Sequence, residues 1–81
     1  MVKLQPGYTV KVREGSKYGI TVPGTTGIVR GVSQGYGGDR VEVEIDRRHP
    51  NNKQYAEQWS APDVRLWPLR IVDLELIGGP W

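Results

Sequence analysis

Arginines and aromatic residues interleave in one polar stretch of the chain, residues 47–62, and in the segment that follows it. Bases stack on exposed aromatic rings and arginine neutralises phosphates, so this combination suits single-stranded nucleic acid. Tryptophan, tyrosine and arginine are also enriched at protein interface hot spots. In a third, purely structural interpretation, Trp59 covers one end of a small core. The candidate contacts are Arg47, Arg48, Tyr55, Trp59, Arg65 and Trp67.

Three carboxylates alternate along another segment, at Glu42, Glu44 and Asp46. On one face of a strand such neighbours lie about 6.5–7 Å apart, a spacing that suits a bound cation or acid–base chemistry. Alternatively, the three residues form a solvated face that arginines such as Arg30 or Arg65 balance from adjacent strands. We expect this second arrangement, because opposite charges on adjacent strands stabilise the pair by about 0.2–1 kcal/mol.

Few residues suit catalysis or metal binding. His49 is the only histidine and the chain has no cysteine, so one chain offers neither a paired-histidine mechanism nor a thiolate metal site. No serine lies in a recognisable nucleophile elbow. Gly35, Gly37 and Gly38 do not precede a helix, as a phosphate-binding loop requires, and they predict a hairpin instead. We therefore expect a solvated His49 and no metal or cofactor.

The scaffold that must position these side chains is predicted to be all-β. Apolar and polar residues alternate with a period of two, most clearly where Val41, Val43 and Ile45 alternate with the carboxylates. Eleven glycines and six prolines divide the chain into short segments, and helix signals are nearly absent. The predicted strands cover residues 8–13, 25–32, 40–46, 63–67 and 74–77.

The connections between these strands differ in length. Residues 14–25 predict a long surface loop, in which Lys17 and Tyr18 extend the basic and aromatic pattern, and residues 33–39 predict a hairpin around Tyr36. Residues 47–62 form a long excursion. Within it, the spacing of Tyr55, Ala56 and Trp59 predicts one helical turn.

Glycines and a proline mark two further features. Alternation breaks at Ile28-Val29 between Gly27 and Gly31, which predicts a bulge or a bend of the sheet. Pro68 predicts the end of the fourth strand, because it has no N–H to donate. After it, we expect a tight turn near residues 72–74, and residues 78–81 are expected to form a frayed tail.

The fourth strand raises a question about Trp67. Alternation with Val64 and Leu66, taken as core residues, places Trp67 on the outer face beside Arg65. A freely exposed tryptophan needs an explanation. We expect the long excursion or a partner, including another subunit, to cover it.

The composition fits one small domain. The 81 residues predict a single domain, 1–81, with its core within about residues 7–77. The formal net charge of +2 is usual for a small domain of any function. No apolar run is long enough to cross a membrane, and residues 1–7 lack the apolar stretch of a secretory signal. We expect a cytoplasmic protein.

Two short motifs carry a resemblance to a known fold. The stretch Gly24-Thr25-Thr26-Gly27-Ile28-Val29 resembles the turn into the second strand of SH3-like barrels of the KOW type. The ending Leu74-Glu75-Leu76-Ile77 is similar to the helical turn and fifth strand that close such barrels. The resemblance implies a small five-stranded SH3-like barrel with one long loop excursion. KOW-type relatives bind RNA or protein, and SH3-like subunits of photosynthetic complexes act as docking surfaces.

A further local resemblance implies an enzyme. Val64-Arg65-Leu66-Trp67-Pro68-Leu69 is similar to the Val-Gln-Ile-Tyr-Pro-Val segment of plasmid-type, type II dihydrofolate reductases, which are tetramers of SH3-like barrels around one pore. The departures concern the family's functional residues. Its ligand-orienting glutamine falls on Arg65, its tyrosine on Trp67 and its lysine on or near Val12.

Together these features predict a non-catalytic SH3-like binding module. It would dock a protein partner or nucleic acid, RNA or single-stranded DNA, through loops 14–25 and 47–62. The alternative is a type II dihydrofolate reductase-like homo-oligomer with a remodelled pore.

Overall fold

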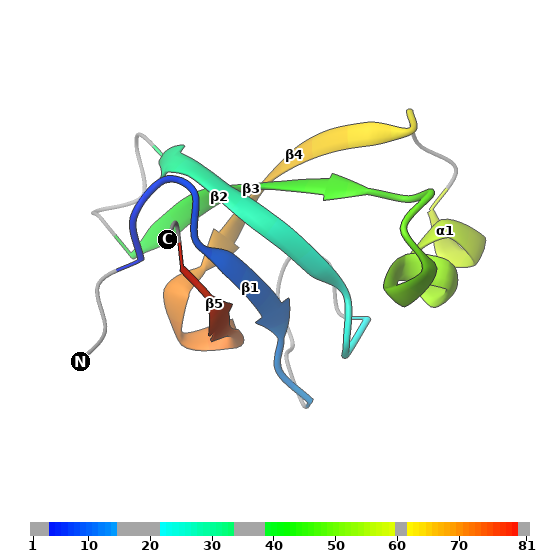
Figure 1. The fold of residues 1–81 in the computed structure, drawn as a ribbon, viewed down its shortest axis with the longest axis horizontal. Helices are drawn as coiled ribbons and strands as arrows, with labels where there is room; N and C mark the ends of the chain where they lie inside the picture. Colours follow the sequence, from blue (N-terminus) through cyan, green and yellow to red (C-terminus); the bar gives the residue numbers. More distant parts are fainter. Residues whose placement is uncertain (1–3, 15–21, 34–38, 60–61, 80–81) are drawn as a thin grey trace.

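The computed structural model describes residues 4–14, 22–33, 39–59 and 62–79. These residues form one antiparallel sheet whose strands run in the order β4-β3-β2-β1-β5 (Figure 1). Its strands are β1 (Thr9–Val12), β2 (Thr26–Val32), β3 (Arg40–Asp46), β4 (Val64–Arg70) and β5 (Leu74–Gly78). The helical elements are the 3-10 turn η1 (Pro50–Asn52), the helix α1 (Lys53–Gln58) and the 3-10 turn η2 (Ile71–Asp73). The predicted all-β fold, with five strands and a long excursion after the third, is confirmed.

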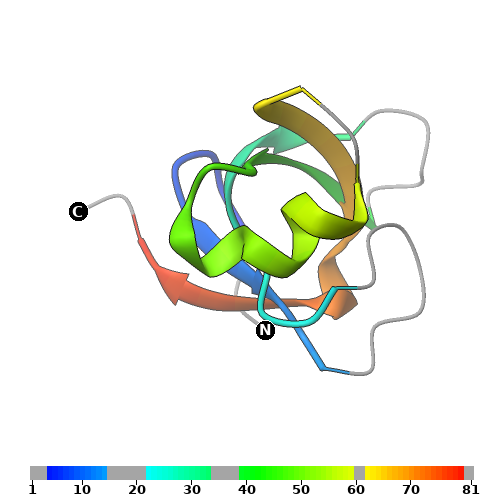
Figure 2. The same ribbon diagram turned by 90° about the vertical axis from the view of Figure 1, so that its right-hand side faces the viewer.

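The sheet curls around one apolar core. Seen from the α1 side, the strands curve around a common axis and α1 lies across the end of the curl (Figure 2). In β3 every second side chain is buried, as the sequence pattern predicts. The buried apolar residues are Leu4, Val10, Val12, Val22, Val29, Val41, Val43, Ile45, Tyr55, Leu69 and Leu74.

Glycine lets β2 approach β3 closely. A Cβ on Gly27 would lie 2.5 Å from Val43 Cγ1 and 2.7 Å from the backbone oxygen of Glu44, so no larger residue fits without a shift. Farther along β2, the pairing with β3 shifts register between Val29 and Gly31. The predicted bulge is therefore present, and Arg30 is the residue at the shift.

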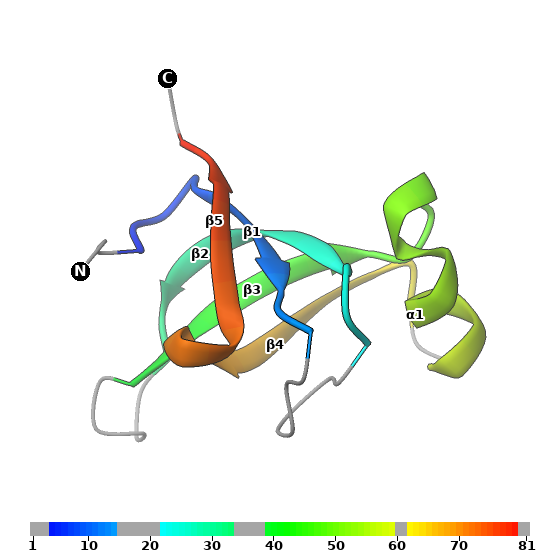
Figure 3. The same cartoon turned by 90° about the horizontal axis from the view of Figure 1, so that it is seen from below.

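The end of the chain closes the sheet as predicted. After the turn η2, β5 runs antiparallel to β1, with Leu74 paired to Val12 and Leu76 to Val10 (Figure 3). Arg13 donates from Nε to the backbone oxygen of Leu74 at 3.0 Å. The predicted turn and closing strand are confirmed.

The predicted end of the fourth strand is wrong. β4 continues through Pro68 to Arg70, and Pro68 pairs with Glu42 of β3. The order of the strands explains this, because β4 is an edge strand and half of its backbone groups point away from the sheet. A proline at such a position removes no ladder hydrogen bond.

The predicted faces of β4 are reversed as well. Val64 and Leu66 are exposed, whereas Trp67 is half-buried against the core and Leu69 is fully buried. Trp67 and Leu69 share one face by alternation. Because the predicted strand ends before Leu69, it lacks the buried residue that shows which face of β4 packs on the core.

The excursion after β3 contains the predicted helical turn, held by one buried polar side chain. Asn52 Oδ1 accepts from the Thr26 backbone N–H at 2.8 Å and from Thr26 Oγ1 at 3.3 Å. Asn52 Nδ2 donates to the backbone oxygens of Thr26 at 3.0 Å and Asp46 at 2.8 Å. Asn52 therefore joins η1 to the start of β2 and the end of β3.

Several predictions concern residues outside the described ranges. They include Lys17 and Tyr18 in the loop 14–25, the hairpin glycines with Tyr36, and the last two residues of the tail. Within the described ranges, no helix has the length and apolar character needed to cross a bilayer.

We predict that Asn52→Ala lowers the free energy of unfolding by about 2–4 kcal/mol, because it leaves buried backbone groups of Thr26 and Asp46 unpaired. Chemical denaturation measures this change. Asn51→Ala is the matched control, since Asn51 is exposed and its only hydrogen bond shown is made by its backbone N–H. Equal effects of the two substitutions would contradict the role of Asn52.

We predict that Gly27→Ala lowers the free energy of unfolding by about 1–3 kcal/mol, because the added methyl group overpacks the contact between β2 and β3. Gly31→Ala serves as the control in the same strand, since its Cβ would meet no atom within 4 Å. Thermal unfolding of both variants measures the difference. A Gly27 variant as stable as the wild type would show that the strands separate at little cost.

Candidate binding site

The aromatic residues of the excursion and of β4 form one cluster at the α1 end of the sheet. Tyr55 of α1 is 0% exposed, and its hydroxyl accepts from Trp67 Nε1–H at 2.9 Å. Trp59, which follows α1, meets Trp67 edge-on, with ring centroids 5.1 Å apart and an interplanar angle of 63°. This contact is favourable for aromatic rings. The Trp59 Nε1 atom is buried and has no hydrogen-bond partner, so packing alone holds the Trp59 side chain.

Arg65 lies over the cluster. Its guanidinium carbon is 4.3 Å from the centroid of the Trp67 ring, a cation–π contact that holds the side chain in place. Arg65 is exposed, and no carboxylate among the described residues forms an ion pair with it. Stacking leaves the edge of a guanidinium, with its N–H donors, available to a carboxylate or phosphate.

The two arginines at the start of the excursion are in a different situation. Arg48 binds both carboxylate oxygens of Asp46 at 3.0 Å, and its backbone N–H donates to Asp46 Oδ1 at 2.9 Å. These hydrogen bonds lower the pKa of Asp46 below its ordinary value. A second carboxylate, Asp63, lies 4.0 Å from the Arg48 guanidinium. The charge of Arg48 is therefore largely balanced within the chain.

A hollow of about 450 Å³ lies beside these arginines. It is lined by Arg47, Arg48, His49, Pro50, Lys53, Ala56 and Glu57. The backbone N–H of Arg47 donates to the Asp63 backbone oxygen at 2.8 Å, which joins the excursion to the residue before β4. Asp63 thus links the basic part of the excursion to the start of β4.

The carboxylates of β3 lie on the outer face of the sheet, and the expected balance by an adjacent strand is found at Glu44, whereas Asp46 is balanced from the excursion. Glu44 binds Arg30 of β2 at 2.8 Å, and Asp46 binds Arg48. Arg65 is not a balancing base, because it pairs in register with Ile45 and so lies on the opposite face from Glu44. No group of three potential metal ligands occurs among the described residues.

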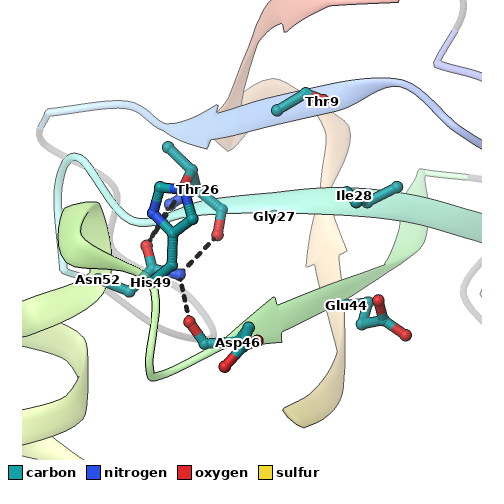
Figure 4. A pocket seen from close by; sticks show the side chains of 8 residues that line it. All are labelled: Thr9, Thr26, Gly27, Ile28, Glu44, Asp46, His49 and Asn52. Atoms are coloured by element: carbon teal, nitrogen blue, oxygen red, sulfur yellow. Dashed lines mark hydrogen bonds between the residues drawn. The ribbon is translucent and has the colours of Figure 1, made fainter. Parts of the chain in front are cut away.

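A cleft of about 340 Å³ adjoins these carboxylates on the outer face (Figure 4). It is lined by Thr9, Thr26, Gly27, Ile28, Glu44, Asp46, His49 and Asn52. His49 is exposed, and its Nδ1 accepts from the Asn51 backbone N–H at 3.1 Å, so it caps η1. The Asn52 side chain is used by the fold. The polar groups of this cleft therefore have structural roles within the chain.

The structure separates the six predicted contact residues into two groups. Tyr55, Trp59, Arg65 and Trp67 form the cluster, whereas Arg47 and Arg48 lie beside the hollow. The prediction of Tyr55 as a contact is wrong, because its side chain is fully buried and inaccessible to a partner. Of the two covers expected for Trp67, the excursion or a partner, the structure shows the excursion, through contacts of Trp67 with Tyr55 and Trp59.

The sequence prediction does not include two exposed residues that are neighbours of Arg65 in β4. Val64 is 41% exposed and Leu66 is 50% exposed on the outer face of β4. The signal that could have identified them is Leu69, whose burial reverses the predicted faces. They flank Arg65 in the sequence, and their side chains lie on the face of β4 opposite to that of Arg65.

Comparisons with known proteins give no relative. No protein-family model, no curated protein and no solved structure matches the chain.

We predict that Arg48→Ala raises the pKa of Asp46 towards its ordinary value, because the arginine donates hydrogen bonds to the ionised form. A depressed folded-state pKa contributes stability that is complete above the unfolded value of about 4 and is lost as the pH falls through the folded value. The variant should therefore lose less stability on acidification. NMR titration of the Asp46 carboxyl carbon tests this, with Lys53→Ala as the control, and an unchanged pKa in Arg48→Ala would contradict it.

Proposed function

We propose that this chain is a non-catalytic binding module that docks a protein partner at its α1 end, where Arg65 binds a carboxylate of that partner. The supporting observation is the exposed guanidinium of Arg65, held 4.3 Å over the Trp67 ring with no ion-pair partner among the described residues. An arginine held in this way loses little conformational freedom on binding. Arginine is also one of the residue types enriched at interface hot spots.

The state of the aromatic rings favours a protein over nucleic acid. Base stacking requires accessible ring faces. Tyr55 is fully buried, and Trp67 contacts Arg65 on one side and Trp59 on another. Arg48 is balanced by Asp46, so it contributes little to phosphate binding. Val64 and Leu66, the sequence neighbours of Arg65, expose apolar side chains on the other face of β4, which suits a protein surface.

The expectations drawn from resemblance accompany this proposal. A docking role agrees with the function that the KOW-type SH3-like resemblance implies, and the proposed setting is the cytoplasm. The loop 14–25 remains a proposed part of the surface, since residues 15–21 lie outside the described ranges. The reductase-like alternative requires residues 64–69 at a pore between subunits. Trp67 packs against residues of its own chain, and no observation favours the reductase.

The experiment uses an N-acetylated, C-amidated hexaglutamate as an acidic probe and follows backbone and arginine side-chain NMR signals. We expect shifts at Arg65 and its neighbours. Arg65→Ala should weaken binding about tenfold or more, because it removes a charge-assisted hydrogen bond. Arg65→Lys should also weaken it, since lysine lacks the planar fork. Arg48→Ala is the matched control and should change the affinity less than about twofold.

A second titration separates protein from nucleic acid. An eight-nucleotide oligothymidylate is added at about 50 and 200 mM salt, where phosphate contacts lose affinity steeply with salt. We expect no binding that depends on Arg65. Salt-sensitive binding of the oligonucleotide that Arg65→Ala abolishes would replace the protein partner by nucleic acid. Failure of hexaglutamate to perturb Arg65 would refute the carboxylate site.

A further inference from the structure

One edge of the sheet is open beside Arg65. β4 is the last strand of the sheet, and among the described residues only β3 pairs with it. In Figures 1 and 3 it forms the outer border of the sheet. Three successive residues at its start, Val64, Arg65 and Leu66, are exposed, and burial begins at Trp67. We call residues 64–66 the open segment.

The backbone of the open segment has a definite orientation. The Asp63 backbone oxygen accepts from the Arg47 N–H just before β4, and the Ile71 N–H donates to the Asp39 backbone oxygen just after it. In a strand the N–H and C=O of one residue point to the same side, and this side alternates along the chain. Odd-numbered residues therefore face β3. Val64 and Leu66 direct their N–H and C=O groups to the open edge.

The same alternation explains why only the open segment is suited to pair with a further strand. Pro68 is the next even-numbered residue, and it has no N–H to offer. Proteins commonly protect edge strands with proline and charged residues, and Pro68 and Arg70 provide both in the second half of β4. The first half has two exposed apolar side chains, and its one charged residue, Arg65, lies over the Trp67 ring on the opposite face. An edge that is free of proline and flanked by apolar surface suits the addition of a strand.

We propose that an extended segment of the protein partner adds to the open segment of β4 as an antiparallel strand and that this segment alternates acidic and apolar residues. The inference rests on the proposed function and deepens it by naming the form of the partner. Antiparallel addition continues the arrangement of the whole sheet. Strand addition supplies affinity through the backbone and specificity through alternate side chains.

The alternation of apolar and acidic residues in the partner segment follows from the side chains on the two faces of β4, which are apolar on one face and basic on the other. Residues of the added strand opposite Val64 and Leu66 lie on the outer face, where apolar side chains pack against these two. The residue opposite Arg65 lies on the other face and meets the stacked guanidinium. An acidic residue at this position supplies the complementary charge. The pattern is thus apolar, acidic, apolar.

A second copy of this chain fits the edge poorly. Antiparallel pairing of two β4 strands about Arg65 places the two guanidinium groups opposite each other, which is unfavourable. Pairing about Leu66 places Val64 opposite Pro68, so one hydrogen bond of the ladder is lost. Even-numbered residues also meet in the register about Val64, which places Arg65 opposite Asp63 but Leu66 opposite Pro62, so a hydrogen bond of the ladder is lost there too. The edge therefore favours a different chain as its partner.

The test uses an N-acetylated, C-amidated hexapeptide of alternating glutamate and valine, and NMR follows its binding to the full chain. A block isomer, three glutamates followed by three valines, has the same charge and composition. We expect the alternating peptide to bind at least about tenfold more tightly and to shift the amides of Val64 and Leu66. Equal affinities for the two isomers would refute strand addition. Hexaglutamate binding through Arg65 would still stand in that case, so the two proposals fail separately.

Backbone methylation tests the pairing itself. In an antiparallel pair the residues opposite Val64 and Leu66 exchange hydrogen bonds with them, and these are the valines of the peptide. N-methylation of the valines should abolish binding, whereas N-methylation of the glutamates should leave it within about threefold. Binding that survives both forms would refute strand addition. Loss with the glutamate form alone would refute the antiparallel direction.

Variants of the protein complete the test. Leu66→Ser should weaken the alternating peptide about tenfold, and Ile77→Ser in β5, an exposed residue on the other edge strand, should not. The two side chains are 50% and 47% exposed, so neither substitution should disturb the core. Light scattering measures the assembly state. A dimer whose interface includes residues 64–66 would overturn the proposal in favour of a second copy.

Discussion

The amide of Asn52 is the constraint on which the α1 end of this protein depends. It makes four hydrogen bonds to Thr26 of β2 and Asp46 of β3, two as acceptor and two as donor, and it is 1% exposed, so water cannot replace them. A helix of six residues has little stability of its own. The position of α1 is set by Asn52, the residue directly before its first residue, Lys53. The candidate binding surface is built outward from that point.

A chain of contacts leads from Asn52 to the surface. Three residues after it, Tyr55 enters the core and accepts a hydrogen bond from Trp67 across to β4. Trp67 then supports Arg65 on its ring, while Trp59 packs against its edge. Each member restricts the next, so the guanidinium is positioned by the core. This arrangement explains why a residue on an edge strand can be both exposed and held in place.

Alternation predicted much of the scaffold because it reports directly which face of a strand is buried. It locates β3 at residues 40–46, and its break between Gly27 and Gly31 predicts a bulge or bend where the register shifts. It fails in β4, because Pro68 predicts the end of the strand and so excludes Leu69. Once Leu69 is known to be buried, alternation assigns Trp67 to the inner face and Val64 and Leu66 to the outer face. A proline in an edge strand and one in a loop look alike in a sequence.

The candidate site could be predicted only in part, because residue type does not show which side chains the fold buries or pairs. Residue type identified Trp59, Arg65 and Trp67, but it could not show that Tyr55 is consumed by the core or that Arg48 is balanced by Asp46. Asn51 and Asn52 are adjacent and identical in type, and only the tertiary contacts show which one is buried. The cleft on the outer face likewise results from the path of the excursion.

The position of Pro68 has a consequence for the behaviour of the chain at high concentration. Sheet edges that template fibrils present about six or seven residues of uninterrupted, apolar, proline-free strand. Here the accessible stretch is interrupted after Leu66 by burial and then by Pro68. Arg65 adds a charge in its centre. The edge is thus long enough for a few hydrogen bonds and too short to propagate, which lets a small domain keep an open strand and resist aggregation.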